Sequence, residues 1–261
     1  MTLREALRDA ERRLDAAGVE TPRVDAELLL AHVLGTTRSG LYADLERDVD
    51  GTLEPLLRRR EAREPLAYVL GEWGFRHLTL RTDARALVPR PETEIVVERC
   101  LALVSGTVEP RVLDIGVGSG AIALSLKHER PDARIVGVDV SVDALALAQE
   151  NARRLGIDVD LHEGDISAAA DGWDLVVSNP PYVGTLDGLQ PELRFEPYEA
   201  LVGTGLHEQI ARAASTRFIV FEVGLGQARS VAEALVRSGY GDVTVTADLA
   251  GVERVVEGRH E

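Results

Sequence analysis

The chain has 261 residues, of which 45% are hydrophobic, and this is enough apolar content for one large domain or for two smaller ones. Its formal net charge of −15 argues against a protein that binds duplex DNA, because phosphate neutralisation needs clustered Lys and Arg. The single cysteine, Cys100, excludes an internal disulfide and a cysteine-based metal cluster. The six histidines lack metal-ligand spacing, so no metal site is expected.

The sequence shows neither a signal-peptide pattern nor an apolar run near the roughly 20 residues of a membrane helix, so we expect a cytoplasmic protein without membrane contact. The charge is distributed unevenly along the chain. Residues 1–80 contain 12 Arg against 15 Asp and Glu, which is a net charge of −3, and residues 81–261 carry the remaining −12. Direct nucleic-acid binding is therefore not expected of the second part, where the chemical motifs lie.

The first part of the chain has the patterns of short helices. In LREALRDAERRL the apolar positions follow one helix face: Leu3, Ala6, Leu7, Ala10 and Leu14. Thr21-Pro22 predicts an N-cap followed by proline at the first helical position, and Gly35 predicts the end of that helix. Another helix around Leu57 should end at Pro65. Residues 1–75 are thus predicted to form a small helical bundle.

From residue 68 onward, strand patterns appear. GEWGFRHLTLRTD predicts a β-hairpin linker within residues 68–83, and the alternation of strands and helices after it predicts an α/β domain over residues 84–261. Only a short turn-rich segment separates the last two candidate strands, so we expect them to pair antiparallel at one edge of a mainly parallel sheet. The seven candidate strands are residues 111–115, 134–139, 159–163, 173–177, 217–223, 243–246 and 252–257.

A glycine-rich turn follows the first of these strands in VLDIGVGSGAIALSL. Gly116, Gly118 and Gly120 allow a sharp turn and a close approach of a ligand to the main chain, and the next helix presents its N-terminal N–H groups. Asp139 ends the second strand, 19 residues beyond the last glycine, where an acidic side chain can accept hydrogen bonds from ribose hydroxyls. The spacing G-x-G-x-G differs from the G-x-G-x-x-G of nicotinamide dinucleotide sites.

The stretch SNPPYVG, residues 178–184, follows an apolar strand. Two successive prolines cannot continue a sheet ladder, so the strand must stop there and lead into a stiff loop. The side-chain carbonyl of Asn179 and the main-chain carbonyl of Pro180 can each accept one N–H of a planar NH₂ group, while Pro181 stiffens the loop and Tyr182 can lie against a flat substrate group. This arrangement would aim a delocalised nitrogen lone pair at a methyl donor, and alignment supplies much of such a rate.

The glycine turn, with its tight spacing and a preceding acidic residue, resembles the class I methyltransferases that bind S-adenosylmethionine and release S-adenosylhomocysteine. The resemblance implies a seven-stranded, mainly parallel, Rossmann-like sheet. It also implies that Asp114 faces the amino acid part of the cofactor and that Gly164-Asp165 lies near adenine. The implied cofactor-binding residues are Asp114, Gly116, Val117, Gly118, Ser119, Gly120, Asp139, Val140, Asp165, Ile166 and Asn179.

The Asn-Pro-Pro-Tyr motif resembles methyltransferases that modify a planar nitrogen. With PLAYVLGEWGF, PRPETE, EPYEAL, FEVGLGQ and the ending DLAGVERVVEGR, the chain resembles the glutamine N5-methyltransferases of class I peptide-chain release factors from about residue 65 to residue 259. The resemblance implies that residues Asn179 to Tyr182 are catalytic and that the substrate is the glutamine of a Gly-Gly-Gln loop. Arg90, Glu92 and Glu222 are candidate substrate residues, although Arg90 and Glu92 could equally tie the linker to the sheet.

Three alternatives stay open at this point. A glutamine of a ribosomal protein is the nearest variant of the substrate, and an adenine N6-methyltransferase on DNA or RNA would use the same motif but would need a flipped base and a basic track. A non-catalytic assembly protein could retain the cofactor fold. We further expect a monomer whose helical first domain recognises the release factor, because an amide pocket alone sees too few atoms to select one glutamine.

Overall fold

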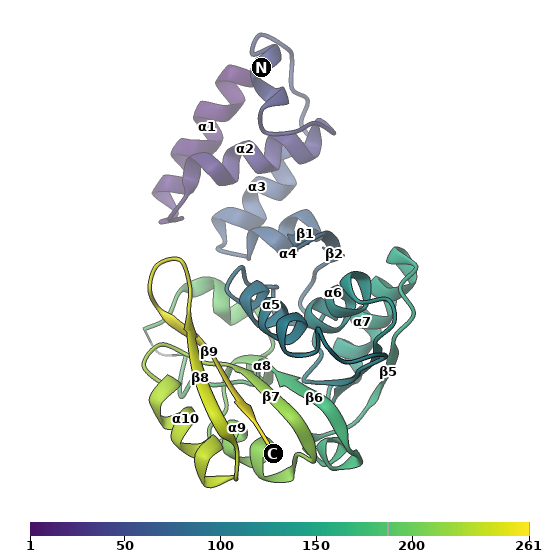
Figure 1. Ribbon diagram of the computed structural model, residues 1–261. Helices are drawn as coiled ribbons and strands as arrows, with labels where there is room; N and C mark the ends of the chain where they lie inside the picture. Colours follow the sequence, from purple (N-terminus) through teal and green to yellow (C-terminus); the bar gives the residue numbers. More distant parts are fainter. Residues whose placement is uncertain (187, 261) are drawn as a thin grey trace. The chain divides into compact units, whose positions relative to one another are not determined.

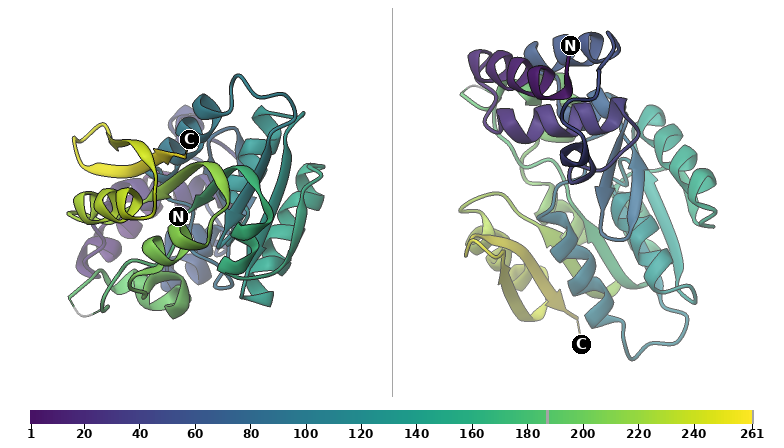
Figure 2. Two further views of the ribbon diagram at one scale, coloured as in Figure 1. Left: turned by 60° about the horizontal axis from the view of Figure 1, so that its bottom comes forward. Right: turned by 90° about the horizontal axis from the view of Figure 1, so that it is seen from above.

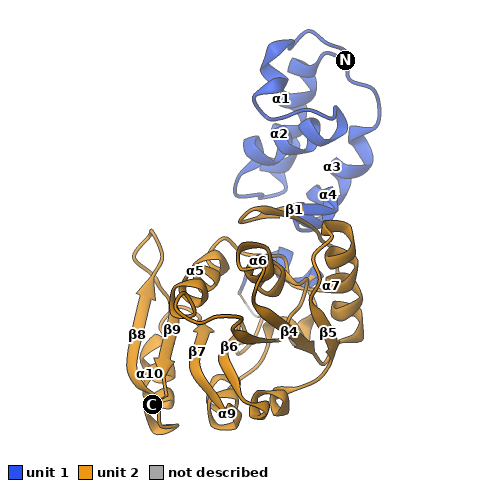
Figure 3. Ribbon diagram, turned by 45° about the vertical axis from the view of Figure 1, so that its right-hand side comes forward, with its two compact units in different colours: residues 1–72, 189–195 blue, residues 73–188, 196–261 orange. Residues whose placement is uncertain are grey.

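The computed structural model describes residues 1–186 and 188–260 (Figure 1). The chain divides into two compact units, coloured separately in Figure 3. The first unit comprises Met1–Glu72 and Leu189–Phe195, and the second comprises Trp73–Gly188 and Glu196–Glu261. None of the helices in the described part of the chain is long and apolar enough to cross a membrane.

The first unit is helical, as the sequence indicates. Its helices are α1 (Leu3–Ala16), α2 (Pro22–Val33), η1 (Gly40–Ala43), α3 (Leu53–Glu61), α4 (Leu66–Leu70) and η3 (Pro191–Phe195). The five apolar positions predicted to share one face of the first helix are all buried in α1. They pack in one hydrophobic cluster with leucines of α2 and α3, including Leu29, Leu30 and Leu57.

The predicted start of α2 at Thr21-Pro22 is confirmed, whereas the predicted end of α3 at Pro65 is wrong. Thr21 occupies the N-cap position of α2, but its hydroxyl donates to Asp25 at 2.8 Å instead of capping the backbone. Helix α3 ends at Glu61, before Arg63 takes a left-handed conformation with φ of 68°, and Pro65 then occupies the N-cap position of α4. The proline therefore precedes the start of a helix and does not end the previous one.

A segment far along the chain belongs to this first unit. Glu192 of η3 accepts hydrogen bonds from Arg63, at 2.7 Å, and from Arg60, at 2.9 Å. Arg60 is buried and also pairs with the buried Asp25 at 2.7 Å. Gln190 adds a hydrogen bond of 2.8 Å to Glu20. Residues 189–195 are thus held to the helical unit by ionic and polar contacts.

The second unit begins with the predicted hairpin, whose strands are β1 (Glu72–Phe75) and β2 (Leu78–Arg81). Its described residues then form a seven-stranded sheet in the order β5-β4-β3-β6-β7-β9-β8. The strands are β3 (Arg111–Ile115), β4 (Arg134–Asp139), β5 (Asp160–Glu163), β6 (Trp173–Ser178), β7 (Thr216–Glu222), β8 (Gly241–Ala247) and β9 (Glu253–Arg259). The pairs among β3 to β7 are parallel, and β9 pairs antiparallel with both β7 and β8. The predicted antiparallel edge is confirmed.

Helices cover both faces of this sheet (Figure 2). The adjacent residues Val112 and Leu113 of β3 are buried in separate hydrophobic clusters, as expected when successive side chains of a strand point to opposite faces. The first cluster contains residues of α5, α6 and α7, and the second contains residues of α9 and α10. The helices are α5 (Thr93–Leu103), α6 (Ala121–Glu129), α7 (Val142–Leu155), η2 (Ile166–Asp171), α8 (Tyr198–Leu201), α9 (Leu206–Ala213) and α10 (Ala228–Arg237).

The chain runs outward from β3 to β4 and β5 on one side, and then returns to β6 and β7 on the other. This reversal of strand order opens a crevice at the carboxyl ends of β3 and β6, which is where open α/β sheets bind their ligands. The glycine turn follows β3, and the Asn-Pro-Pro-Tyr segment follows β6. The fold therefore brings the two motifs to the same edge of the sheet.

Candidate active site

A pocket of about 460 Å³ lies in the second unit at this edge of the sheet. Most of the cofactor and catalytic residues predicted from the sequence line it: Gly116, Val117, Gly118, Ser119, Asp139, Val140, Asp165, Ile166, Asn179, Pro180 and Pro181. Arg90 lines it as well. The described residues that line the pocket do not include five other predicted residues, namely Asp114, Gly120, Tyr182, Glu92 and Glu222.

The glycine turn has the geometry that its sequence predicts. Gly116, Gly118 and Gly120 have φ values of 75°, 55° and 87°, a left-handed conformation that side chains disfavour. A Cβ atom on Gly120, the residue before α6, would come within 2.8 Å of the Leu124 side chain. The backbone N–H groups of Gly116 and Val117 both donate to the carbonyl of Val138, at 2.8 and 3.0 Å. The turn is thus pinned to the neighbouring strand β4.

Asp139 at the end of β4 braces the same turn. One of its carboxylate oxygens accepts a hydrogen bond of 2.9 Å from the Gly118 N–H, and the other accepts one of 2.9 Å from the Ser141 N–H. Ser141 is itself the N-cap of α7. The carboxylate is only partly buried and lines the pocket, so each oxygen retains a lone pair for a ligand hydroxyl.

Asp114 lies behind the turn, in the interior. It is 1% exposed, and one carboxylate oxygen accepts a 3.1 Å hydrogen bond from the Ala123 N–H in the first turn of α6. Its other oxygen has no hydrogen-bond partner among residues 1–186 and 188–260. Burial raises the pKa of this carboxyl to about 7, and the nearby Asp139 raises it as well. Asp114 therefore combines an unsatisfied acceptor with a carboxyl that favours its neutral form.

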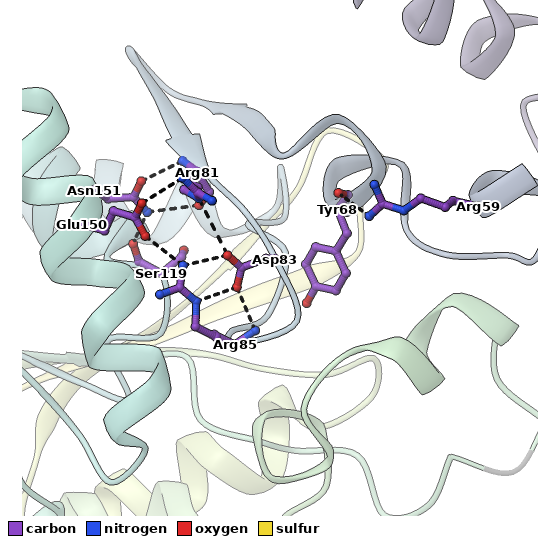
Figure 4. A network of polar contacts seen from close by, with 8 residues as sticks. All are labelled: Arg59, Tyr68, Arg81, Asp83, Arg85, Ser119, Glu150 and Asn151. Atoms are coloured by element: carbon purple, nitrogen blue, oxygen red, sulfur yellow. Dashed lines mark hydrogen bonds and ion pairs between the residues drawn. The ribbon is translucent and has the colours of Figure 1, made fainter. Parts of the chain in front are cut away.

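A polar network around the buried Asn151 holds the back of the turn, and Ser119 alone among the members described below was predicted from the sequence (Figure 4). The fully buried Asn151 of α7 donates to the carbonyls of Ser119, at 2.9 Å, and Arg81, at 3.1 Å, and it accepts a 2.7 Å hydrogen bond from the Arg81 N–H. Arg85, in the segment after β2, donates to Asp83 at 2.7 Å. The hairpin and the glycine turn are thus fastened to one helix.

The Asn-Pro-Pro-Tyr loop is stiff for reasons beyond its prolines. The hydroxyl of Ser178 donates to the carbonyl of Ile115 on β3 at 2.7 Å, and the carbonyl of Tyr182 accepts from the Gln227 side chain at 2.9 Å. The Tyr182 ring packs so closely on Gly224 that a Cβ there would lie 2.8 Å from the ring. Asn179 lines the pocket, whereas Tyr182 packs behind it.

Asn179 is connected to a chain of polar side chains that leads into the interior. Its side-chain nitrogen lies 3.5 Å from the hydroxyl oxygen of Thr93, the first residue of α5. Thr93 in turn donates to the buried carboxyl of Glu222 at 2.6 Å, and the Tyr182 hydroxyl lies 3.4 Å from the other oxygen of that carboxyl. Thr93 was missed as a site residue, although it lies within PRPETE.

The remaining candidates are engaged with other side chains. The guanidinium of Arg90 pairs with the buried Glu196, whose second oxygen accepts a 3.0 Å hydrogen bond from the Val88 N–H. Arg90 therefore both lines the pocket and ties the PRPETE segment to the EPYEAL segment. Glu92 lies 3.7 Å from Arg254 and so is turned toward a cation from the β8–β9 end of the sheet.

Comparisons with known proteins agree with the fold of both parts of the chain. A family model described as the PrmC N-terminal domain matches residues 5–71, and the methyltransferase small domain matches residues 93–191. The solved hMettl16 catalytic domain shares the fold, with a TM-score of 0.55 at 15% identity over 70% of this chain and 75% of that chain. A human methyltransferase 10 domain containing protein gives 0.53 at 16% identity over 70% of this chain and 88% of its own. Fold and site together define a methyltransferase of class I architecture.

Relatives identify the family within that class. The release factor glutamine methyltransferase of Deinococcus radiodurans is 40% identical over 275 residues, which is 99% of this chain and 99% of the relative. That of Escherichia coli (strain K12) is 39% identical over 273 residues, 97% of each. The chain belongs to the release factor glutamine methyltransferase family.

Proposed function

We propose that this protein transfers a methyl group from S-adenosylmethionine to the side-chain nitrogen of the glutamine in the Gly-Gly-Gln loop of class I release factors. The observation that carries the proposal is the position of Asn179 and Pro180, which line the same pocket as the glycine turn and Asp139. The near full-length similarity to release factor glutamine methyltransferases supports this substrate. Such a substrate would place the reaction in the cytoplasm.

The residues present fit the proposed cofactor. The left-handed glycines Gly116 and Gly118 expose main chain to the pocket without side chains of their own, and Asp139 retains acceptor capacity for two ribose hydroxyls. Asp165 and Ile166 line the pocket and would flank the adenine, as the family resemblance implies. When bound, S-adenosylmethionine supplies an electrophilic methyl group on sulfur. The part of Asp114 in binding its amino acid portion stays a prediction, because this carboxyl lies behind the pocket lining.

The chain's own contribution to the reaction is orientation. An amide nitrogen is a poor nucleophile because its lone pair is delocalised into the carbonyl. If Asn179 and Pro180 each accept one N–H of the substrate amide through a carbonyl oxygen, the plane of that amide is fixed and its lone pair is directed at the methyl group. The stiff loop described above keeps both acceptors in place, so that little ordering remains to be done when substrate binds.

The test is methylation of purified release factor by the full-length protein. Mass spectrometry should show one added methyl group on the peptide that contains the Gly-Gly-Gln loop. A release factor whose Gly-Gly-Gln glutamine is replaced by alanine serves as the matched control and should stay unmodified. Ribosomal protein and adenine-containing DNA or RNA are assayed in parallel. Methyl transfer to one of those, with none to the release factor, would overturn the proposal.

We also propose that residues 1–72 recognise the release factor. The support is the match of residues 5–71 to a separate domain model, described as the PrmC N-terminal domain, together with the small number of substrate atoms that an amide pocket can contact. Amide hydrogen exchange on the full chain, with and without release factor, should show added protection within these residues. Protection confined to residues 73–261 would contradict a recognition role.

A further inference from the structure

A buried carboxyl group lies at the end of β7, one layer behind the pocket lining. Glu222 is 2% exposed, and its two oxygens contact hydroxyl groups from two different elements, Thr93 of α5 at 2.6 Å and Tyr182 of the Asn-Pro-Pro-Tyr loop at 3.4 Å. Its main-chain carbonyl is occupied by the His207 ring at 2.8 Å. Neither the glycine turn nor the proposed substrate contacts explain why this carboxyl is present.

The donors and acceptors of the hydrogen-bonded series Glu222, Thr93 and Asn179 determine how the Asn179 amide must be oriented. An ionised carboxylate only accepts hydrogen bonds, so the single proton of the Thr93 hydroxyl is used on Glu222. Toward Asn179, the Thr93 oxygen can then only accept, and it must face the NH₂ end of that amide. The carbonyl end of Asn179 is consequently the end that remains for the substrate. The direction of each hydrogen bond, from donor to acceptor, is thus set by Glu222 and passed through Thr93 to Asn179.

We propose that Thr93 and Glu222 are positioning residues that hold the Asn179 amide with its carbonyl oxygen available to the substrate NH₂ group. The inference rests on the proposed function, because it assigns the orientation that glutamine methylation requires. Without these hydrogen bonds the Asn179 amide could rotate by half a turn and exchange its nitrogen and oxygen ends, since the two ends have nearly the same shape. A reversed amide would present a donor to the donor of the substrate, and the substrate would not be held.

The ionisation of Glu222 connects this chain to pH. Burial and, to a smaller extent, the charge of Glu92 raise the pKa of this carboxyl to about 7, against the lowering effects of Thr93, Tyr182 and Arg254. Once protonated, Glu222 can itself donate a proton to the Thr93 oxygen. The Thr93 proton is then free to turn toward Asn179, and the imposed polarity is lost. The oriented form of Asn179 should therefore be populated as pH rises through about 7.

Three full-length variants test this role: Thr93→Val, which removes the hydroxyl but keeps the shape; Thr93→Ser, which keeps the hydroxyl; and Glu222→Gln, which keeps an acceptor oxygen for Thr93 but cannot ionise. We expect Thr93→Val to lower kcat on release factor about tenfold or more, as for one lost oriented hydrogen bond. Thr93→Ser should stay within about threefold of the parent chain. Cofactor affinity, measured by calorimetry, should be unchanged in all three.

The pH profile separates positioning from a merely structural role. For the parent chain, kcat should rise about tenfold between pH 6 and pH 8, following the ionised fraction of a group with a pKa near 7. Glu222→Gln, which is neutral at every pH as protonated Glu222 is, should show a flat profile over the same range, with a kcat near that of the parent chain at pH 6. If it keeps the rising profile of the parent chain, or if Thr93→Val keeps the parent kcat, the positioning role is wrong. A parent chain that is inactive on the release factor would instead defeat the proposed function.

A folding defect cannot imitate the expected result. If Thr93→Val unfolds, the other two variants still test the proposal. Thr93→Ser is expected to be active, and Glu222→Gln is expected to lose the pH response of kcat. A structural role for Thr93 would lower thermal stability and cofactor binding together and would leave the pH profile of the remaining activity unaltered. Thr93→Ser with a kcat as low as that of Thr93→Val would also contradict the proposal.

Discussion

Replacing the buried Asp114 by asparagine should make the protein less sensitive to pH. The pKa of Asp114 is raised from 3.8 to about 7 in the folded chain by burial, and Asp139 adds to this effect. A raised carboxyl pKa means that the folded state holds a proton that the unfolded state has lost, so stability is fully present below pH 3.8 and is lost as pH rises through 7. Each pH unit in between costs about 1.4 kcal/mol.

The magnitude follows from that window. Between pH 5 and pH 7, two units, the parent chain should lose about 2 to 3 kcal/mol of unfolding free energy through this residue. Asp114→Asn keeps an oxygen that can accept from the Ala123 N–H and cannot ionise, so it should lose none of this amount. Urea denaturation of both proteins from pH 5 to pH 8 measures the difference, and the contribution of Glu222, which also has a raised pKa, cancels because both proteins contain it.

A difference between the two proteins that stays constant over this range would refute the reasoning. It would mean that Asp114 is already ionised in the folded state at pH 5, with a partner that compensates its burial. Cys100, whose own thiol pKa is raised by burial and by Asp114, stays protonated throughout and does not contribute to the comparison.

Three further predictions concern the pocket and the glycine turn beside it. Asp139→Ala should weaken S-adenosylmethionine binding by roughly 1.5 to 3 kcal/mol in calorimetry, and unchanged affinity in a folded variant would reject its ribose role. Asn179→Ala and Asn179→Asp should lower kcat on release factor by about 10²-fold or more with little change in cofactor affinity, and near-parental turnover of Asn179→Ala would defeat the orientation mechanism. Gly120→Ala should cost about 2 kcal/mol or more in urea denaturation, because a Cβ would strain φ and meet Leu124 at 2.8 Å. Gly116→Ala, with a similar φ but open space, should cost less, and equal losses would rule out the contact with Leu124 as the cause.

The sheet of the second unit could be predicted because its signals are local. Strands buried on both faces are short apolar runs, and the glycine turn after Ile115 and the prolines after Asn179 indicate where two of them end. All seven predicted strands lie within two residues of the observed bounds at each end. The buried face of α1 could be predicted in the same way, from the helical spacing of its apolar residues.

Contacts between distant segments left no such signal. Asn151 lies on an ordinary helical pattern, and only the fold shows that its side chain satisfies the backbone of Arg81 and Ser119. Thr93 sits in a recognised motif, but its link to Glu222 joins residues 129 positions apart. Side-chain hydrogen bonds of this kind depend on which elements the topology brings together, and spacing along the chain does not encode them.

The packing of residues 189–195 with the helical unit means that the chain passes between the two units three times, near residues 72, 188 and 195. Any hybrid between two members of this family must therefore exchange residues 1–72 and residues 189–195 together. Moving the first alone would pair Arg60 and Arg63 of one parent with whatever the other parent carries in place of Glu192. Sequence changes at these positions should therefore occur together in members of the family, although residues 73–188 of the methyltransferase unit lie between them.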